Sequence, residues 1–175
     1  MKHIQLDDLN EMSKIYRLNL VNSITGYKSA HLIGSQSLDG KNNVAVFSSV
    51  IHLGSNPALI GFILRPTSVP RHTYSNIKAT GIFTLNAITK KQIKDAHHTS
   101  AKYPEEISEF DKTNLKIEKK GDWNAPFVKD VPIQMGCRYQ NEYHIKENDT
   151  KLIVASVEHF YVSESLLLED GWVQL

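Results

Sequence analysis

Residues 29–86 read SAHLIGSQSLDGKNNVAVFSSVIHLGSNPALIGFILRPTSVPRHTYSNIKATGIFTLN, and this stretch decides the fold. Its apolar runs have the length and spacing of β-strands over residues 30–37, 44–53, 58–64 and 82–88. Leu38-Asp39-Gly40-Lys41 has the composition of a hairpin turn, and Asn56-Pro57 interrupts the chain before the third run. Because residues 58–64 are almost continuously apolar, we expect both faces of that strand to be covered.

Short helices are expected between and around these strands. Pro70 precedes and Gly81 follows a helix predicted over residues 71–80, so its start and its end both carry the usual signals. An N-terminal helix is predicted over residues 6–17, with Asp7 and Asp8 in its first turn, where the helix dipole favours acids. Two more helices are predicted over residues 90–97 and 105–112, and the polar segment 116–129 is expected to be irregular.

The C-terminal part of the chain alternates apolar and polar residues over 134–145 and 152–162. This pattern predicts two long, half-exposed antiparallel strands, joined by a turn at residues 147–150. A turn and one last strand are expected over residues 170–175. Six or seven strands with few crossover helices predict a single, mainly β domain over residues 1–175, built as a closed or partly closed antiparallel barrel with peripheral helices.

Composition excludes several classes of partner. The 20 basic and 19 acidic residues give a formal charge of +1 without a basic stripe, which disfavours nucleic acid. No apolar run approaches the roughly 20 residues that span a bilayer. The first residues are too polar and acidic for a signal peptide, and the single Cys137 cannot form an internal disulfide. We therefore expect a cytoplasmic protein that binds neither membranes nor nucleic acid.

The strongest candidate site is a group of polar residues around the predicted helix 71–80. Arg65 directly follows an apolar strand, and Arg71, His72 and Thr73 open the helix. Arginine side chains and the free N–H groups of a helix start can converge on one anion, so this group predicts a phosphate site. The alternative is that both arginines are only solvated. The chain has no P-loop and no GxGxxG pattern, which disfavours a Walker or Rossmann site.

Other polar residues admit two interpretations. Asn42-Asn43 follows the hairpin turn and is either turn chemistry or an amide that pairs with a planar heterocycle. Ser48-Ser49 is either a strand end or a further set of ligand contacts. Ser100 and Lys102 lie in a loop that is either surface or a cover over a ligand.

No protein-based catalytic group stands out. The adjacent His97 and His98 diverge on a helix and lack partners at metal-ligand spacing, so no metal site is predicted. Cys137 lies in an alternating strand and is expected to be a small buried apolar residue. The sequence has no GxSxG or HExxH motif and no paired-carboxylate arrangement for acid–base catalysis, which suggests that a bound cofactor supplies the chemistry.

Taken in order, several segments resemble the flavin reductase-like, FMN-binding split-barrel family. The resemblance covers roughly residues 16–172 and rests on an ordered set of short motifs rather than on one diagnostic signature. These motifs are Ile33-Gly34-Ser35, Gly40 to Ser49, Asn56-Pro57-Ala58-Leu59, Arg71 to Ile77, Thr80 to Asn86, Ser100-Ala101-Lys102, Ser108-Glu109-Phe110 and Leu115.

This resemblance implies a mainly β protein, a split antiparallel β-barrel of Greek-key type that forms a homodimer and carries FMN, or alternatively FAD. It implies that the isoalloxazine ring and ribityl chain lie along Asn43, Ala45, Phe47, Ser48 and Ser49. Arg65, Arg71, His72 and Thr73 would hold the phosphate, and Ser100 and Lys102 would close the site.

The implied activity is hydride transfer from NADH or NADPH to the bound flavin. The electrons would then pass to free flavin, iron, another small molecule or a protein acceptor, with no side chain needed as a general acid. The alternatives are a non-catalytic FMN-binding electron carrier, or a related split barrel that oxidises pyridoxamine phosphate or binds haem.

Overall fold

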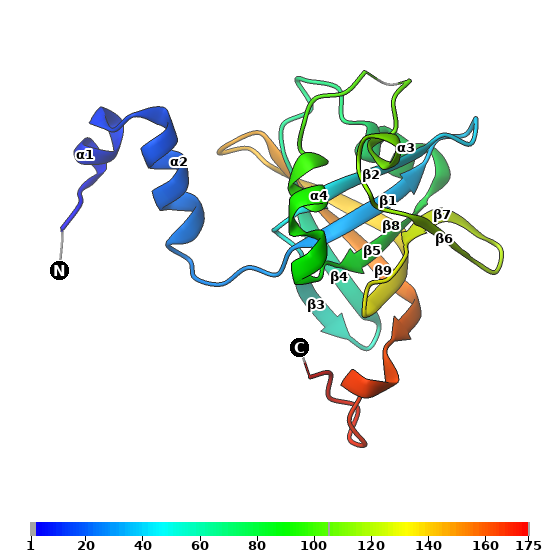
Figure 1. Cartoon of the computed structure of the whole chain (residues 1–175). Helices are drawn as coiled ribbons and strands as arrows, with labels where there is room; N and C mark the ends of the chain where they lie inside the picture. Colours follow the sequence, from blue (N-terminus) through cyan, green and yellow to red (C-terminus); the bar gives the residue numbers. More distant parts are fainter. Residues whose placement is uncertain (1–2, 105, 175) are drawn as a thin grey trace.

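A curled antiparallel sheet forms the body of the molecule (Figure 1). The computed structural model describes residues 3–104 and 106–174, and its main sheet has seven strands in the order β2-β1-β5-β8-β9-β4-β3. Phe47 of β2 packs edge-on against Phe62 of β4, with ring centroids 5.1 Å apart. Since β2 and β4 are far apart in the sheet order, this contact shows that the sheet curls into a barrel. The expected mainly β, antiparallel barrel with peripheral helices is confirmed. The strands of this sheet are β1 (His31–Gln36), β2 (Asn42–Phe47), β3 (Ile51–Ser55), β4 (Ala58–Leu64), β5 (Ile82–Ala87), β8 (Ile133–Ile145) and β9 (Thr150–Val162).

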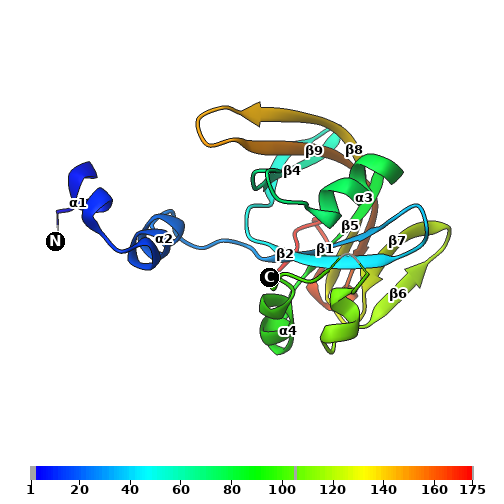
Figure 2. The same cartoon turned by 90° about the horizontal axis from the view of Figure 1, so that it is seen from above.

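Short helices and a separate hairpin surround the barrel (Figures 1 and 2). The hairpin of β6 (Ile117–Lys120) and β7 (Trp123–Val128) forms a second, two-stranded sheet. No helix in the described ranges is long and apolar enough to cross a membrane. The helices are α1 (Leu6–Glu11), α2 (Lys14–Ser23), α3 (His72–Thr80) and α4 (Ile93–His98), with 3-10 turns η1 (Lys90–Gln92), η2 (Glu109–Lys112) and η3 (Glu164–Leu166).

The strand predictions hold where hydrophobic periodicity is strong. Strands β1, β4, β5, β8 and β9 lie within two residues of their predicted limits. The strand predicted over residues 44–53 is wrong as a single element, because the chain leaves the sheet at Ser48–Val50 and divides into β2 and β3. These two strands pair with β1 and β4, which are separated in the sheet, so the chain must turn between them.

The segment 116–129, expected to be irregular, is the β6–β7 hairpin. Its turn uses Gly121 at φ +53°, and Ala125, Phe127 and Val128 are buried. Pro126 is tolerated in β7 because this strand pairs only with β6, so one side of it requires no backbone donor.

Helix boundaries depart further from expectation. The helix predicted over residues 6–17 is two helices, and Ser13 begins the second by accepting a hydrogen bond from the Tyr16 N–H at 3.3 Å. The predicted helix 90–97 is η1 followed by α4. In the predicted helix 105–112 only residues 109–112 are helical, and Glu105 lies outside the described residues.

The structure also tests the predicted C-terminal strand and the predicted end of the helix before Gly81. In place of a last strand over residues 170–175, one isolated bridge joins Leu167 to Val173, and Leu175 lies outside the described residues. Gly81 ends α3 at φ +74°, in the left-handed conformation expected of a helix cap.

The core lies on both faces of β1. Ile33 belongs to the cluster inside the barrel, together with Phe62 and Phe83. Leu32 belongs to a second cluster on the other face, beneath α4 and η2, which includes Ala96 and Phe110. Cys137 is fully buried in the barrel cluster, so its predicted role as a small apolar residue is confirmed.

The outer side of β4 is only partly covered. Ile60, Phe62 and Leu64 of this strand point into the core, whereas Leu59 and Ile63 on the other side are half-buried. The prediction that both faces of this strand are covered is therefore wrong within the single chain.

Candidate functional site

The start of α3 is the first element of the candidate site. Arg71 occupies the N-cap position but makes no side-chain capping hydrogen bond, and the first turn contains no acidic residue. Thr73 is buried at this helix start, while Arg71 and His72 are half-buried. The helix therefore presents its uncapped N–H groups and positive dipole end together with cationic side chains.

A direct contact joins this helix start to β2. The side-chain amide of Asn43 lies between Thr73 Oγ1 at 3.0 Å and Glu109 Oε2 at 3.2 Å. With its nitrogen toward the carboxylate, the amide donates to Glu109 and accepts from the Thr73 hydroxyl, so both partners are satisfied. Two residues predicted to bind the cofactor, Asn43 and Thr73, are thus in contact although 30 positions separate them.

Two side chains from the α4–η2 region satisfy the free edge of β2. Glu109 Oε2 accepts the backbone N–H of Val44 at 3.1 Å, and Thr99 Oγ1 accepts that of Val46 at 2.9 Å. Burial raises the pKa of the Glu109 carboxyl, and the Val44 N–H and the charge of His72 oppose this increase. No sequence pattern points to Thr99, and Glu109 stands out only as part of the segment Ser108-Glu109-Phe110 that resembles the family.

A small polar hollow of about 30 Å³ adjoins these contacts. It has room for roughly two water molecules, so in this chain it is a recess rather than a pocket for a large ligand. The hollow lies between the β1–β2 turn and α3 and is lined by Ser37, Asp39, Lys41, Asn42, Asn43, His72, Asn76 and Ile107.

The cationic side chains near α3 have few protein partners. Arg71 Nε donates to the Pro66 carbonyl at a long 3.4 Å, and Arg65 is exposed. None of the six ion pairs found among the described residues includes Arg65, Arg71 or His72. These side chains are therefore available to an anionic ligand.

Some of the other predicted site residues pack or form hydrogen bonds within the protein, and the rest are exposed or half-buried. Phe47 packs in the barrel core, and the Ser49 hydroxyl bonds the backbone N–H and carbonyl of Ile63 at 3.1 and 3.2 Å. Ser100 Oγ donates to the His97 carbonyl at 2.6 Å. Ala45 is half-buried on the same side of β2 as Asn43, and Ser48, Ser100 and Lys102 are exposed.

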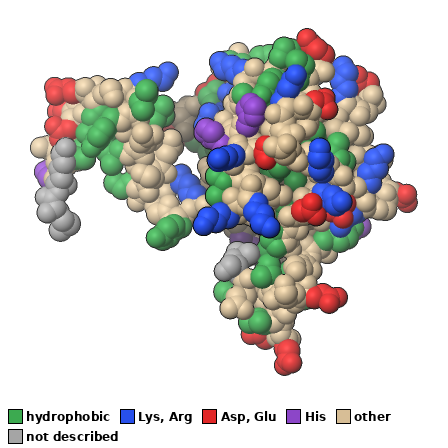
Figure 3. Space-filling model, viewed as in Figure 1, with side chains coloured by type: hydrophobic (Ala, Val, Ile, Leu, Met, Phe, Trp, Pro, Cys, Tyr) green, Lys and Arg blue, Asp and Glu red, His purple; other side chains and the backbone are tan. Residues whose placement is uncertain are grey.

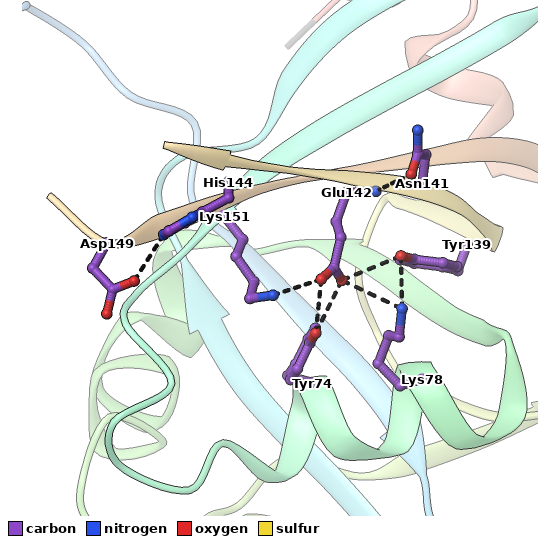
Figure 4. A network of polar contacts seen from close by, with 8 residues as sticks. All are labelled: Tyr74, Lys78, Tyr139, Asn141, Glu142, His144, Asp149 and Lys151. Carbon is purple, nitrogen blue, oxygen red and sulfur yellow. Dashed lines mark hydrogen bonds and ion pairs between the residues drawn. The ribbon is translucent and has the colours of Figure 1, made fainter. Parts of the chain in front are cut away.

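A polar network holds α3 against the long strand β8 (Figure 4). The Glu142 carboxylate accepts from Lys151 Nζ at 2.6 Å and from the Tyr74 hydroxyl at 2.9 Å. Lys78 lies 3.5 Å from the same carboxylate and donates to the Tyr139 hydroxyl at 2.9 Å. Burial alone would raise the pKa of Glu142, but these hydrogen bonds and lysine charges outweigh it and lower the pKa to about 2. The helix that starts at the candidate site is therefore fixed one turn further on.

Comparison with known families decides the relationship. The model of the flavin reductase like domain matches residues 28–171 of the chain. The chain belongs to this family. The match includes the hairpin turn, the start of α3 and the β2 edge, so the candidate site lies within the flavin reductase like domain.

Individual relatives agree with this assignment. A crystal structure from Shewanella frigidimarina, of a protein assigned as a flavin reductase with a split barrel domain, is 37% identical, with a TM-score of 0.94, covering 99% of this chain and 86% of that one. Component B of nitrilotriacetate monooxygenase from Bacillus cereus is 22% identical at a TM-score of 0.82, covering 99% and 87%, and shares the fold.

A curated relative from Methanothermobacter thermautotrophicus, an uncharacterized protein, is 28% identical over 79% of this chain. The chain spans 66% of that relative's length, just under two thirds. The split barrel of this flavin reductase like domain is thus shared with oxidoreductase structures.

Proposed function

We propose that this chain binds FMN and catalyses hydride transfer from NADH or NADPH to the bound flavin, which then passes electrons to free flavin, iron or another acceptor. The observation that carries the proposal is the uncapped start of α3, where Arg71 and His72 lie beside the buried contact of Thr73 with Asn43. Membership in the flavin reductase like family supports the flavin, and the helix start supports the phosphate.

The donor chemistry at α3 fits a phosphate monoester. No side chain caps the helix start, and neither the arginine nor the histidine beside it forms an ion pair among the described residues, although the charge of His72 acts on the Glu109 carboxyl. A phosphate has several acceptor oxygens and two negative charges to share among such donors. We therefore assign Arg71, His72, Thr73 and the N–H groups of the first turn to the FMN phosphate, with Arg65 at its outer side.

The flavin ring is assigned to the side of β2 that carries Asn43 and Ala45, and to the loop at Ser48. Ala45 has a small side chain that permits close approach of a flat ring. Phe47 and Ser49 are already engaged within the protein, so we assign them to holding the end of β2 in place beside the ring. Ser100 and Lys102 remain our candidates for the cover.

The protein's part in the reaction is to position the bound flavin and to stabilise negative charge on it. Bound FMN would supply reversible acceptance of a hydride, a chemistry that the side chains lack. Glu109 and Thr99 hold the edge of β2, which fixes Asn43 next to Thr73. The positive end of α3 stabilises negative charge on a ligand held there. No side chain of the site is assigned as a general acid.

Titrations with FMN and riboflavin test the phosphate assignment. Arg71→Ala and Thr73→Ala should each weaken FMN binding by roughly 5- to 150-fold, as expected for the loss of about 1–3 kcal/mol from a charge-assisted contact. Riboflavin, which lacks the phosphate, should bind these variants and the wild type about equally. Lys116→Ala and Thr80→Ala, which change an exposed lysine and the other end of α3, are the controls. Unchanged FMN affinity in both site variants would show that the phosphate lies elsewhere.

Anaerobic stopped-flow mixing tests the activity. The flavin band of the holoprotein should bleach with NADH or NADPH much faster than free FMN does. Bleaching at the background rate would instead identify a non-catalytic electron carrier. A Soret band in the purified protein would contradict both and indicate haem.

A further inference from the structure

A cavity of about 300 Å³ lies at the end of α3, between the β1–β2 turn and the β6–β7 hairpin (Figures 1 and 2). We call it the α3-end cavity. Its lining contains none of the residues assigned above to the flavin ring or its phosphate. Its volume is at the lower end of the range of small-molecule sites, so it has room for one ring system rather than for a whole dinucleotide.

Four apolar side chains line the α3-end cavity. Ala79 comes from the last turn of α3, Ile82 from the start of β5 and Ala125 from β7, and Leu38 comes from the β1–β2 turn. Leu38 is 80% exposed, so a large apolar side chain is left in water at the edge of the cavity. A flat ring that packs against Leu38 would remove this surface from water. The lining therefore suits a planar, partly apolar group.

Hydrogen-bond acceptors gather where α3 meets the cavity. The carbonyl groups of Ala79 and Thr80 lie in the last turn, and neither accepts a hydrogen bond in the described part of the chain. The Gln36 amide nitrogen donates to Asn42 Oδ1 at 3.0 Å, so the amide oxygen is the end left for a ligand. The negative end of the α3 dipole adds to these acceptors. A ligand held here must therefore present N–H donors.

Asn124 adds a side-chain amide from the hairpin side of the cavity. This side chain is exposed and forms no hydrogen bond with the rest of the described chain. A carboxamide can accept from the exocyclic amine of adenine and donate to the neighbouring ring nitrogen, as asparagine does in nucleic-acid recognition. Guanine carries an oxygen in place of that amine, and the oxygen would face the acceptors at the end of α3. The polar groups therefore favour adenine over guanine.

The α3-end cavity adjoins the small polar hollow near the start of α3, because Ser37 lines both. The hollow also contacts Asn76, which is four residues before Thr80, so the two spaces are roughly 6 Å apart along the helix axis. The basic side chains of Lys41 and His72 line the hollow. A ring bound in the cavity can thus direct an attached sugar and phosphate past Ser37 toward the start of α3.

The charge of the surrounding surface favours a single nucleotide over a nucleic acid. Lysine, arginine and acidic side chains are interspersed over the barrel in Figure 3. Nucleic-acid sites instead carry a continuous basic stripe that follows the phosphate backbone. The local combination of acceptors, an apolar edge and two basic side chains matches one base with its own phosphate.

We propose that the α3-end cavity binds the adenine ring of a nucleotide, with its amine toward Asn124 and the end of α3 and its phosphate toward the start of α3. Three kinds of ligand carry this group: FAD, NADH or NADPH, and a free adenine nucleotide such as AMP. Only the first two rest on the proposed function. Because AMP can be titrated into flavin-free protein, this proposal can fail while the proposed function holds, and the reverse.

Calorimetric titration of the flavin-free protein with AMP and GMP tests the site. The wild type should bind AMP with a dissociation constant of roughly 10–100 µM, and GMP at least about tenfold more weakly. Asn124→Ala should weaken AMP binding about 3- to 10-fold, as expected for one lost hydrogen bond. Ala79→Leu keeps a good helix former and fills the cavity, so it should weaken AMP binding at least about 20-fold.

The matched control is Asn22→Ala, which removes an exposed amide from α2 and should change AMP affinity less than about twofold. Far-UV circular dichroism and urea unfolding show whether each variant is folded. Absence of AMP binding, equal affinities for AMP and GMP, or AMP binding unchanged in both Asn124→Ala and Ala79→Leu would overturn the proposal.

The Ala79→Leu variant also separates the three sources of the adenine. If FAD supplies it, the wild type binds FAD more tightly than FMN, and the variant loses this advantage while its FMN affinity is unchanged. If NADH or NADPH supplies it, the variant raises the apparent dissociation constant of that nucleotide in stopped-flow reduction of the FMN-loaded protein. If a free nucleotide is the ligand, AMP binds FMN-loaded and FAD-loaded protein equally well. Equal weakening of FMN and AMP by Ala79→Leu would place the cavity within the flavin site and refute a separate adenine site.

Discussion

Replacing Glu142 with glutamine should destabilise the protein in a strongly pH-dependent way. The carboxylate joins α3 to β8 and β9 through Tyr74, Lys78 and Lys151 (Figure 4). The Glu142→Gln side chain keeps an acceptor for the tyrosine but removes the negative charge that faces two ammonium groups. Because glutamine has nearly the same size and shape as glutamate, the variant measures the contribution of the negative charge alone.

The size of the effect follows from the pKa. A decrease from the ordinary 4.5 to about 2 corresponds to roughly 3 kcal/mol of favourable interaction with the ionised form. The side chains of Lys78 and Lys151 are 42% and 23% exposed, so solvent screens part of this energy. We expect Glu142→Gln to lower the free energy of unfolding by about 1–2 kcal/mol near neutral pH.

The sign of the pH dependence is fixed by the depressed pKa. The contribution is complete above the unfolded-state pKa of 4.5 and is lost as pH falls toward about 2. Urea unfolding of wild type and variant should thus give curves that converge over this acid range. Glu158→Gln removes a more exposed pair with Arg138 and should cost less than about 1 kcal/mol. A difference between wild type and Glu142→Gln that stays constant with pH would refute this account.

Two further substitutions test the packing and electrostatics of β1 and β2. Glu109→Gln keeps an acceptor for the Val44 N–H and removes a buried carboxyl group whose pKa is raised. In the wild type, ionisation of this carboxyl lowers the free energy of unfolding as pH rises above 4.5. The free energy of unfolding of the variant, measured in urea titrations, should therefore increase relative to that of the wild type with increasing pH. No such gain would mean that Glu109 is not strained by burial. Gly34→Ala would place its Cβ 2.0 Å from the Pro126 carbonyl oxygen, so we expect a loss of at least about 3 kcal/mol in thermal or urea unfolding. Gly54→Ala meets only the Pro57 carbonyl, at 3.3 Å, and should be much milder; equal losses would contradict the close approach of β1 to β7.

The sequence predicted the elements whose signal is local. The apolar run of β4 and the alternation in β8 and β9 are complete within each segment, and the Gly81 cap directly follows its helix. The β6–β7 hairpin was missed because its charged residues and Pro126 read as loop. The buried residues of β7 are covered by β1 and β5, which are distant in the sequence, so their burial is evident only in the folded structure.

The residues of the candidate site also fall into those that a local sequence signal predicted and those that only the structure revealed. Arg71, His72 and Thr73 are consecutive at one helix start, so a local signal sufficed to group them. The family resemblance added Asn43, and the structure then showed its contact with Thr73. Thr99 and Glu109 bind β2 from segments more than fifty positions along the chain, and no spacing rule points to them.

By itself, then, the sequence determined the mainly β architecture, the balanced charge and the cationic opening of α3, because periodicity, composition and helix signals act between near neighbours. Only the tertiary structure decided which side chains satisfy the free edge of β2, which polar groups anchor α3 on β8, and which apolar surfaces remain uncovered. The physical reason is that an edge strand, a buried carboxylate and an exposed sheet face are all satisfied by groups distant in sequence, and their identity depends on how the whole sheet curls.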